Sequence, residues 1–156
     1  MISKPNVSLK CAMRTTLSHD FSKVQEVSNQ AERFLLQHGC DEETQADLEL
    51  ALVEACNNAI KYTPRLGLSE PVIVELLVGR AEIELRVTDH GPGFCLPDKA
   101  ELPKSEDENG RGLYLIRRVM DSVRYERGSG SNVLVLRRKR RRSHSRELGA
   151  PRADPP

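Results

Sequence analysis

The chain has 156 residues, of which 38% are hydrophobic and 30% charged, so we expect one soluble globular domain rather than two. Its net charge of +1 is uneven, because residues 137–156 hold eight Lys and Arg against two acids, whereas residues 1–136 hold sixteen against twenty-one. No apolar run approaches the roughly 18 residues that cross a bilayer, and the N-terminus lacks the apolar core of a secretory signal. We therefore expect a cytoplasmic protein that does not associate with membranes.

The first predicted elements are a strand and a helix. Residues 8–17 alternate loosely between polar and apolar side chains, which predicts a strand. Asp20 is a candidate N-cap for the helix that follows, and Gly39 is expected to end that helix at its C′ position. Apolar residues recur between them at three- and four-residue steps and predict one buried helical face: Phe21, Val24, Val27, Ala31, Phe34 and Leu35.

A second helix is expected from Asp41, as its N-cap, to about Tyr62. Glu42 and Glu43 lie in its first turn, where the helix dipole favours acidic side chains. Thr63-Pro64 ends the helix, because proline cannot continue the hydrogen-bond ladder.

The remaining elements predict the fold class. They are expected in the order strand 72–78, strand 83–88, a long irregular loop over 89–109, helix 111–121, strand 122–127 and strand 132–137. Strands that pair as hairpins, with helices gathered on one face, predict an α+β two-layer sandwich with a mixed, mostly antiparallel sheet. We place this domain at residues 1–138 and a disordered basic and proline-rich tail at 139–156.

The scattered cysteines and histidines argue against two kinds of site. Cys11, Cys40, Cys56 and Cys95 show no paired spacing, so we expect free buried thiols and no disulfide framework. The four histidines are equally dispersed, so we do not expect a metal site built from His and Cys ligands. The basic run at 137–142 is not interleaved with aromatic residues, so we expect a solubilising tail and no direct nucleic-acid binding.

The first candidate functional segment lies on the second helix. Glu54, Asn58 and Lys61 are spaced so that they project from one helical face. A carboxylate, an amide oxygen and an ammonium on one stripe could hold Mg²⁺ and phosphates. A solvated helix edge explains the same spacing equally well when the segment is considered alone.

Two glycine-bearing segments add to it. Asp89-His90-Gly91-Pro92-Gly93-Phe94 follows a strong strand, and its carboxylate could accept a hydrogen bond from an exocyclic amine such as that of adenine. The alternative is an ordinary strand-ending turn. Asn109-Gly110-Arg111-Gly112-Leu113 opens the third helix, where exposed N–H groups could bind phosphate, although a capping turn also accounts for it.

Taken in this order, the three segments resemble the N-box, G1 box and G2 box of the GHKL, or Bergerat-fold, superfamily of ATPases and kinases. The resemblance covers roughly residues 8–137 and includes ELALVEACNNAIKY, TDHGPGF and GRGLYLIRRVMDSV. Within the superfamily the chain looks most like the bacterial anti-sigma-factor serine/threonine kinases. It has a short lid between Asp89 and Gly110 and no helix pair bearing a phosphorylatable histidine.

The resemblance implies a role for each matched position. Glu54 corresponds to the general base, Asn58 to the ligand of Mg²⁺, and Asp89 to the residue that binds the adenine amino group. The implied nucleotide-binding positions are Asn57, Asn58, Lys61, Asp89, Gly91, Gly93, Phe94, Gly110, Arg111, Gly112 and Leu113.

The resemblance also implies ATP and Mg²⁺ as cofactors and a partner-switching function. Such a kinase sequesters a sigma factor in one state and phosphorylates a STAS-domain anti-anti-sigma protein in another, commonly as a homodimer. Two alternatives stay open: a nucleotide-dependent binding module without kinase activity, and a detached histidine-kinase-like catalytic domain.

Overall fold

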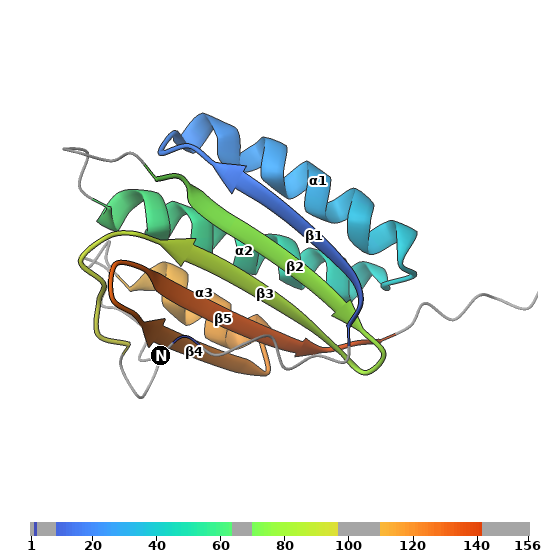
Figure 1. Cartoon of the computed structure of the whole chain (residues 1–156). Helices are drawn as coiled ribbons and strands as arrows, with labels where there is room; N and C mark the ends of the chain where they lie inside the picture. The colour runs from blue at the N-terminus through green and yellow to red at the C-terminus, as the bar shows by residue number, and fades with distance from the viewer. Residues whose placement is uncertain (1, 3–8, 64–69, 97–109, 142–156) are drawn as a thin grey trace, which may run out of the picture.

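A computed structural model describes residues 2, 9–63, 70–96 and 110–141. In chain order the elements are β1 (Leu9–Leu17), a 3₁₀ turn η1 (Phe21–Lys23), α1 (Val24–Gln37), α2 (Glu42–Tyr62), β2 (Val72–Gly79), β3 (Glu82–Asp89), α3 (Arg111–Val119), β4 (Ser122–Arg127) and β5 (Asn132–Lys139). The five strands form one sheet in the order β1-β2-β3-β5-β4, and the three helices lie on one of its faces (Figure 1). The predicted α+β two-layer fold is confirmed.

The sheet differs from the prediction in one respect. We expected a mixed sheet, but each of the four strand pairings in the described residues is antiparallel. The β2–β3 and β4–β5 pairs are hairpins, which can only be antiparallel. Between β1 and β2 the chain forms two helices, so it returns to the end of the sheet at which it left, and β2 runs against β1.

Helix α1 begins later than predicted and ends where expected. Asp20 accepts a hydrogen bond from Ser22 N–H at 2.9 Å, as an N-cap does, but the first turn is 3₁₀. Phe21 therefore falls outside the α-helical repeat and is 49% exposed, so its predicted burial is wrong. At the other end Gly39 N–H binds Leu36 O and Cys40 N–H binds Leu35 O, which is the Schellman pattern.

Helix α2 is the longest element and runs along the sheet towards the end of β3 and the start of α3 (Figure 1). Asp41 Oδ1 accepts a hydrogen bond from Thr44 N–H at 2.7 Å, and hydrogen bonds from Thr44 hold the pKa of Asp41 below its usual value. The helix packs against α1, α3 and β3. Its buried face places Leu48, Leu52 and Ile60 in the core, whereas Glu54, Asn58 and Lys61 line a surface cavity.

The face of the sheet opposite the helices carries a charged network. Because strand residues alternate between the two faces, Glu84 and Arg86 lie opposite the core residues Ile83 and Leu85. Glu84 is fully buried and accepts hydrogen bonds from Arg86 at 3.0 Å and from Arg137 at 2.8 Å. Two guanidinium groups thus compensate the buried carboxylate.

Strand β5 extends two residues beyond the predicted end at residue 137, into the basic run. Lys139 is still in β5, paired with Glu82, and Arg140 N–H binds Ala81 O. The domain boundary that we placed after Arg138 therefore falls inside the last strand, because the arginines there bind acceptors within the domain. Residues 142–156 of the expected tail, and residues 97–109 of the expected loop, lie outside the described part of the chain.

Helix α3 ends at Val119, two residues before the predicted end, since the backbone of Met120 is already extended.

The four cysteines are free thiols, as predicted, although their burial varies. Cys40 and Cys56 are buried, and burial raises the pKa of Cys56 to about 12. Cys95 is exposed, so the expectation of burial is wrong there, because it lies in the loop after β3 rather than in the core. Among the described residues, none of the helices combines the length and apolarity that crossing a membrane would need.

Candidate functional site

The C-terminal half of α2 faces a cavity of about 330 Å³. Glu54, Asn58 and Lys61 line it together, as their helical spacing predicts. The opposite wall comes from the start of α3. The other lining residues are Phe21, Asn57, Tyr62, Gly110, Arg111, Gly112 and Leu115. The structure therefore brings the first and third sequence segments to one cavity.

The start of α3 is open towards this cavity. Gly110 is the N-cap residue with φ of 108°, a left-handed conformation that favours glycine, and no side chain caps it among the described residues. The first hydrogen bond of the helix runs from Tyr114 N–H to Gly110 O, so the preceding N–H groups point out of the helix end. A Cβ atom at Gly112 would meet the Glu54 carboxylate and lie 3.5 Å from Asn58 Nδ2, so the start of α3 approaches these two side chains closely at this glycine.

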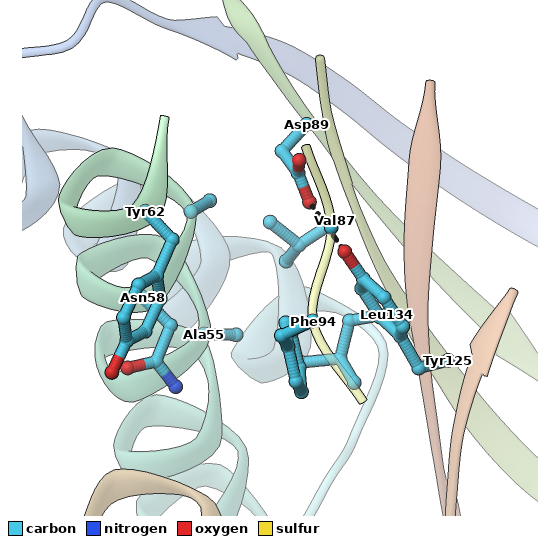
Figure 2. A pocket seen from close by; sticks show the side chains of 10 residues that line it. Ala55, Asn58, Tyr62, Val87, Asp89, Phe94, Tyr125 and Leu134 are labelled. Atoms are coloured by element: carbon cyan, nitrogen blue, oxygen red, sulfur yellow. Dashed lines mark hydrogen bonds between the residues drawn. The ribbon is translucent and has the colours of Figure 1, made fainter. Parts of the chain in front are cut away.

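The second segment, residues 89–94, forms a tight loop that follows β3 along the chain. Asp89 Oδ1 accepts hydrogen bonds from Gly91 N–H at 2.9 Å and from Asn132 Nδ2 at 3.1 Å. The hydroxyl of Tyr125 lies 3.5 Å from Asp89 Oδ2 (Figure 2). Burial, and then the charge of Asp89, raises the pKa of Tyr125 to about 12, so the hydroxyl stays protonated and donates. The carboxylate is thus held by protein donors on both oxygens, weakly on Oδ2.

Phe94 fills the space beside Asp89. Its ring centroid lies 4.1 Å from that of Tyr125 and 6.3 Å from that of Tyr62. Figure 2 shows the ring between α2 on one side and Tyr125 and Leu134 on the other. The remaining cavity next to Asp89 measures about 10 Å³, room for about one water molecule. A planar base can reach Asp89 only if the Phe94 ring moves.

A second cavity of about 170 Å³ lies on the other side of Phe94. Asn58, Tyr62 and Phe94 line it, and so do Cys95, Gly110 and Leu113. Phe94 therefore separates a nearly filled inner pocket that contains Asp89 from an outer cavity at the start of α3. All predicted positions except Gly91 line at least one of the three cavities, and Gly91 packs against the end of α2 at Tyr62 O.

The sequence analysis missed three residues of the β4–β5 hairpin. Tyr125 and Asn132 bind Asp89, and Arg127 donates a hydrogen bond to Pro92 O at 2.9 Å. Asp89 and Asn132 are opposite each other in the β3–β5 pairing. An antiparallel pairing of the third and fifth strands would have pointed to Asn132, but the sequence does not reveal which strands are neighbours.

The donor set fits a divalent metal that is bound mainly through phosphates. Within the described ranges there is no group of three or more His, Cys, Asp and Glu side chains that could hold a metal ion. Asn58 offers one amide oxygen to such a metal in the 330 Å³ cavity, which Glu54 also lines. Mg²⁺ typically uses one or two protein oxygens together with phosphates and water, and this arrangement matches that need.

Comparison with known proteins identifies the family of the domain. Residues 17–138 match the family described as histidine kinase-like ATPase domain. The serine-protein kinase RsbW of Bacillus licheniformis is 34% identical over 100 residues, which cover 58% of this chain and 62% of the relative. The corresponding protein of Bacillus subtilis is 30% identical, with the same coverage. The chain thus spans less than two thirds of the length of these relatives.

Two solved structures share the fold. The RsbU and RsbW domains of a Mycobacterium tuberculosis protein superpose with a TM-score of 0.65 at 19% identity, covering 85% of this chain and 33% of that one. The SiaB–SiaC complex of Pseudomonas aeruginosa gives a TM-score of 0.55 at 14% identity, covering 81% of this chain and 89% of that one. At these identities the likeness concerns the fold alone.

Proposed function

The chain belongs to the family of histidine kinase-like ATPase domains, and from this premise we propose that it is an anti-sigma-factor serine/threonine kinase. In this proposal it binds ATP with Mg²⁺, sequesters a sigma factor and phosphorylates a STAS-domain anti-anti-sigma protein. The similarity to relatives named serine-protein kinase supports this choice within the family.

One observation carries the proposal: the Glu54 carboxylate and the Asn58 amide meet the open start of α3 at Gly112. Phosphoryl transfer needs donors that neutralise the transferred group and a carboxylate that accepts the proton of the attacking hydroxyl. The exposed N–H groups at the start of α3 and the Arg111 side chain supply the first. Glu54 supplies the second, because it lines the same cavity.

The proposal also gives roles to the remaining residues of this cavity. Asn58 would hold Mg²⁺ through its amide oxygen, and the metal would supply positive charge to the phosphates. Asn57 and Lys61 line the cavity beside Asn58, where an amide and an ammonium would hold phosphate oxygens. Leu113 and Phe94 would flank the nucleotide from the outer cavity.

The adenine end requires a rearrangement. Asp89 would accept a hydrogen bond from the adenine amino group, with Gly91 and Gly93 shaping the loop around it. Gly93 has φ of 75°, and a Cβ atom there would come within 3.0 Å of Arg127 Nε, so the loop depends on glycine. The ring of Phe94 must leave the inner pocket before the base enters, and the 170 Å³ cavity next to it offers room.

The direct test is transfer of label from γ-labelled ATP to a purified STAS-domain partner in the presence of Mg²⁺. We expect incorporation into serine or threonine, giving a product that is stable to acid and labile to base. Binding of ATP without any transfer would instead identify a nucleotide-dependent binding module. An acid-labile product would identify a histidine-kinase-like catalytic domain. Either result would overturn the proposed activity.

Capture from the native cell tests the partners separately. Affinity-tagged protein, incubated with ATP or ADP, is expected to retain a sigma factor in one nucleotide state and a STAS-domain protein in the other. Capture of neither protein would contradict the partner-switching part of the proposal while leaving the nucleotide site untouched. Light scattering of the same sample tests whether the chain is the homodimer that we propose.

A further inference from the structure

Asn132 is enclosed by the loop that follows β3. It is 4% exposed and lies opposite Asp89 in the β3–β5 pairing. Its Nδ2 donates to Asp89 Oδ1 at 3.1 Å and to Gly91 O at 3.0 Å. A side-chain amide has two N–H donors, so both are used within the protein. The amide oxygen faces Gly93, where a Cβ atom would lie 3.2 Å away.

These contacts give the two oxygens of Asp89 different roles. Oδ1 accepts from both Asn132 and Gly91 N–H, at distances typical of good hydrogen bonds. Among the described residues, Oδ2 has only the Tyr125 hydroxyl as a donor, at 3.5 Å, which is at the limit of a hydrogen bond. Oδ2 is therefore the oxygen with capacity for a donor from a ligand.

We propose that Asn132 is a positioning residue that makes the Asp89 site selective for a 6-amino purine. By occupying Oδ1 and tying it to the loop, Asn132 prevents the carboxylate from rotating and presents Oδ2, an acceptor, to the base. An exocyclic amine donates to that oxygen, whereas the carbonyl of a 6-oxo purine is an acceptor and leaves it unpaired. This inference rests on the proposed function, because it requires that a purine nucleotide binds at Asp89.

Arg127 provides a matched control. It comes from the same β4–β5 hairpin and binds the same loop through Pro92 O, but no hydrogen bond joins it to Asp89. It is also exposed, so its replacement is tolerated more easily. Asn132→Leu keeps the approximate volume and removes both donors, and Arg127→Leu removes one loop contact without touching the carboxylate.

The experiment measures dissociation constants of ADP and GDP by calorimetry for the wild type and both variants, with circular dichroism to confirm folding. We expect Asn132→Leu to lower the preference for ADP over GDP by about tenfold or more, as loss of an oriented charged hydrogen bond predicts. Arg127→Leu should weaken both nucleotides and leave the preference unchanged. Equal weakening of both nucleotides by Asn132→Leu would overturn the inference and leave the proposed function standing. A wild type that binds neither nucleotide would overturn both.

Asn132→Asp covers the case in which the leucine variant does not fold. It keeps the shape and replaces the donor by a carboxylate next to Asp89. Two adjacent carboxylates raise the pKa of one of them, and the shared proton restores a donor. The preference for ADP should therefore be retained at low pH and fall as the pH rises and the shared proton is lost. The wild-type profile, measured over the same pH range, is the control. A variant profile parallel to that of the wild type would contradict the positioning role.

Discussion

The two ends of α2 are held in different ways. At its N-terminal end, Arg138 forms ion pairs with Asp47 and Glu43 and donates to Val119 O, and Arg141 pairs with Glu43. Arg140 donates to Gly79 O and His38 O, which ties β5 to β2 and to the end of α1. At its C-terminal end, Glu54, Asn58 and Lys61 face a cavity of about 330 Å³, and Asn58 also faces one of about 170 Å³.

This contrast separates stability from function along one helix. The N-terminal end of α2, which we call the closed end, is fixed by charged hydrogen bonds from the basic run at the end of β5. The C-terminal end of α2, which we call the open end, keeps polar side chains next to the Phe94 ring, and this ring has to move when the nucleotide binds. Substitutions at the closed end should therefore change the free energy of unfolding, and those at the open end should change binding or catalysis.

The largest effect is expected from Glu54→Gln at the open end. Loss of a general base should slow phosphoryl transfer by about 10²- to 10⁴-fold, because the amide cannot accept the proton of the attacking hydroxyl. The affinity for ATP should stay nearly unchanged, since Glu54 does not neutralise phosphate charge. Single-turnover transfer and calorimetry measure the two quantities. A parallel loss of both would mean that Glu54 is not a dedicated base.

Asp89→Asn should weaken ATP binding by about 10- to 100-fold, as removal of a charged acceptor predicts. The rate at saturating ATP should change much less, because Asp89 lies at the adenine end and not in the cavity that contains Glu54. Calorimetric titration and saturation kinetics check this division. Undiminished affinity would remove Asp89 from the nucleotide site.

At the closed end, Arg138→Met should lower the free energy of unfolding by about 2 kcal/mol, because it leaves the partly buried Asp47 without its partner. Methionine keeps the apolar stem, so packing is largely retained. Arg14 is the control, because it is exposed and its partner Glu75 keeps Arg86, so Arg14→Met should cost less than about 1 kcal/mol. Urea unfolding measures both variants. A change in ATP affinity of folded Arg138→Met would break the separation between the two ends.

The smallest effect is expected from Phe94→Ala, which removes the ring that fills the inner pocket. A nucleotide then no longer has to displace it, so the affinity for ATP should rise by about three- to tenfold. Phe94→Leu should give an intermediate value. Stopped-flow association and calorimetry provide the measurement. A weaker affinity in both variants would show that the ring contributes more as a contact than as an obstacle.

Local signals predicted most of the fold. Asp41, Gly39 and the α2 periodicity placed the helices, because caps and helical repeats act over a few residues. The burial of Phe21 was predicted wrongly, since a 3₁₀ turn interrupts the repeat there. The contacts of the basic run with the domain were not predicted, because its hydrogen-bond acceptors lie about 60 to 100 residues away along the chain.

The candidate site also contains residues that the sequence predicted and residues that it did not. The glycine segments and the Glu54–Asn58 spacing were visible in the sequence, and the structure brings them to adjoining cavities. Asn132 was missed because only the antiparallel β3–β5 pairing places it beside Asp89, and Tyr125 was missed because it reaches Asp89 from β4, the strand next to β5. The filling of the inner pocket by Phe94 is likewise a result of packing and has no signature in the sequence.

Hydrogen–deuterium exchange, measured by mass spectrometry with and without ATP and Mg²⁺, tests most directly the claim that the nucleotide binds at the open end of α2. We expect slower exchange over residues 54–62, 89–96 and 110–116, and little change over 42–48 and 136–141. Protection confined to the closed end, or none in any of the three open-end segments at saturating ATP, would contradict this account.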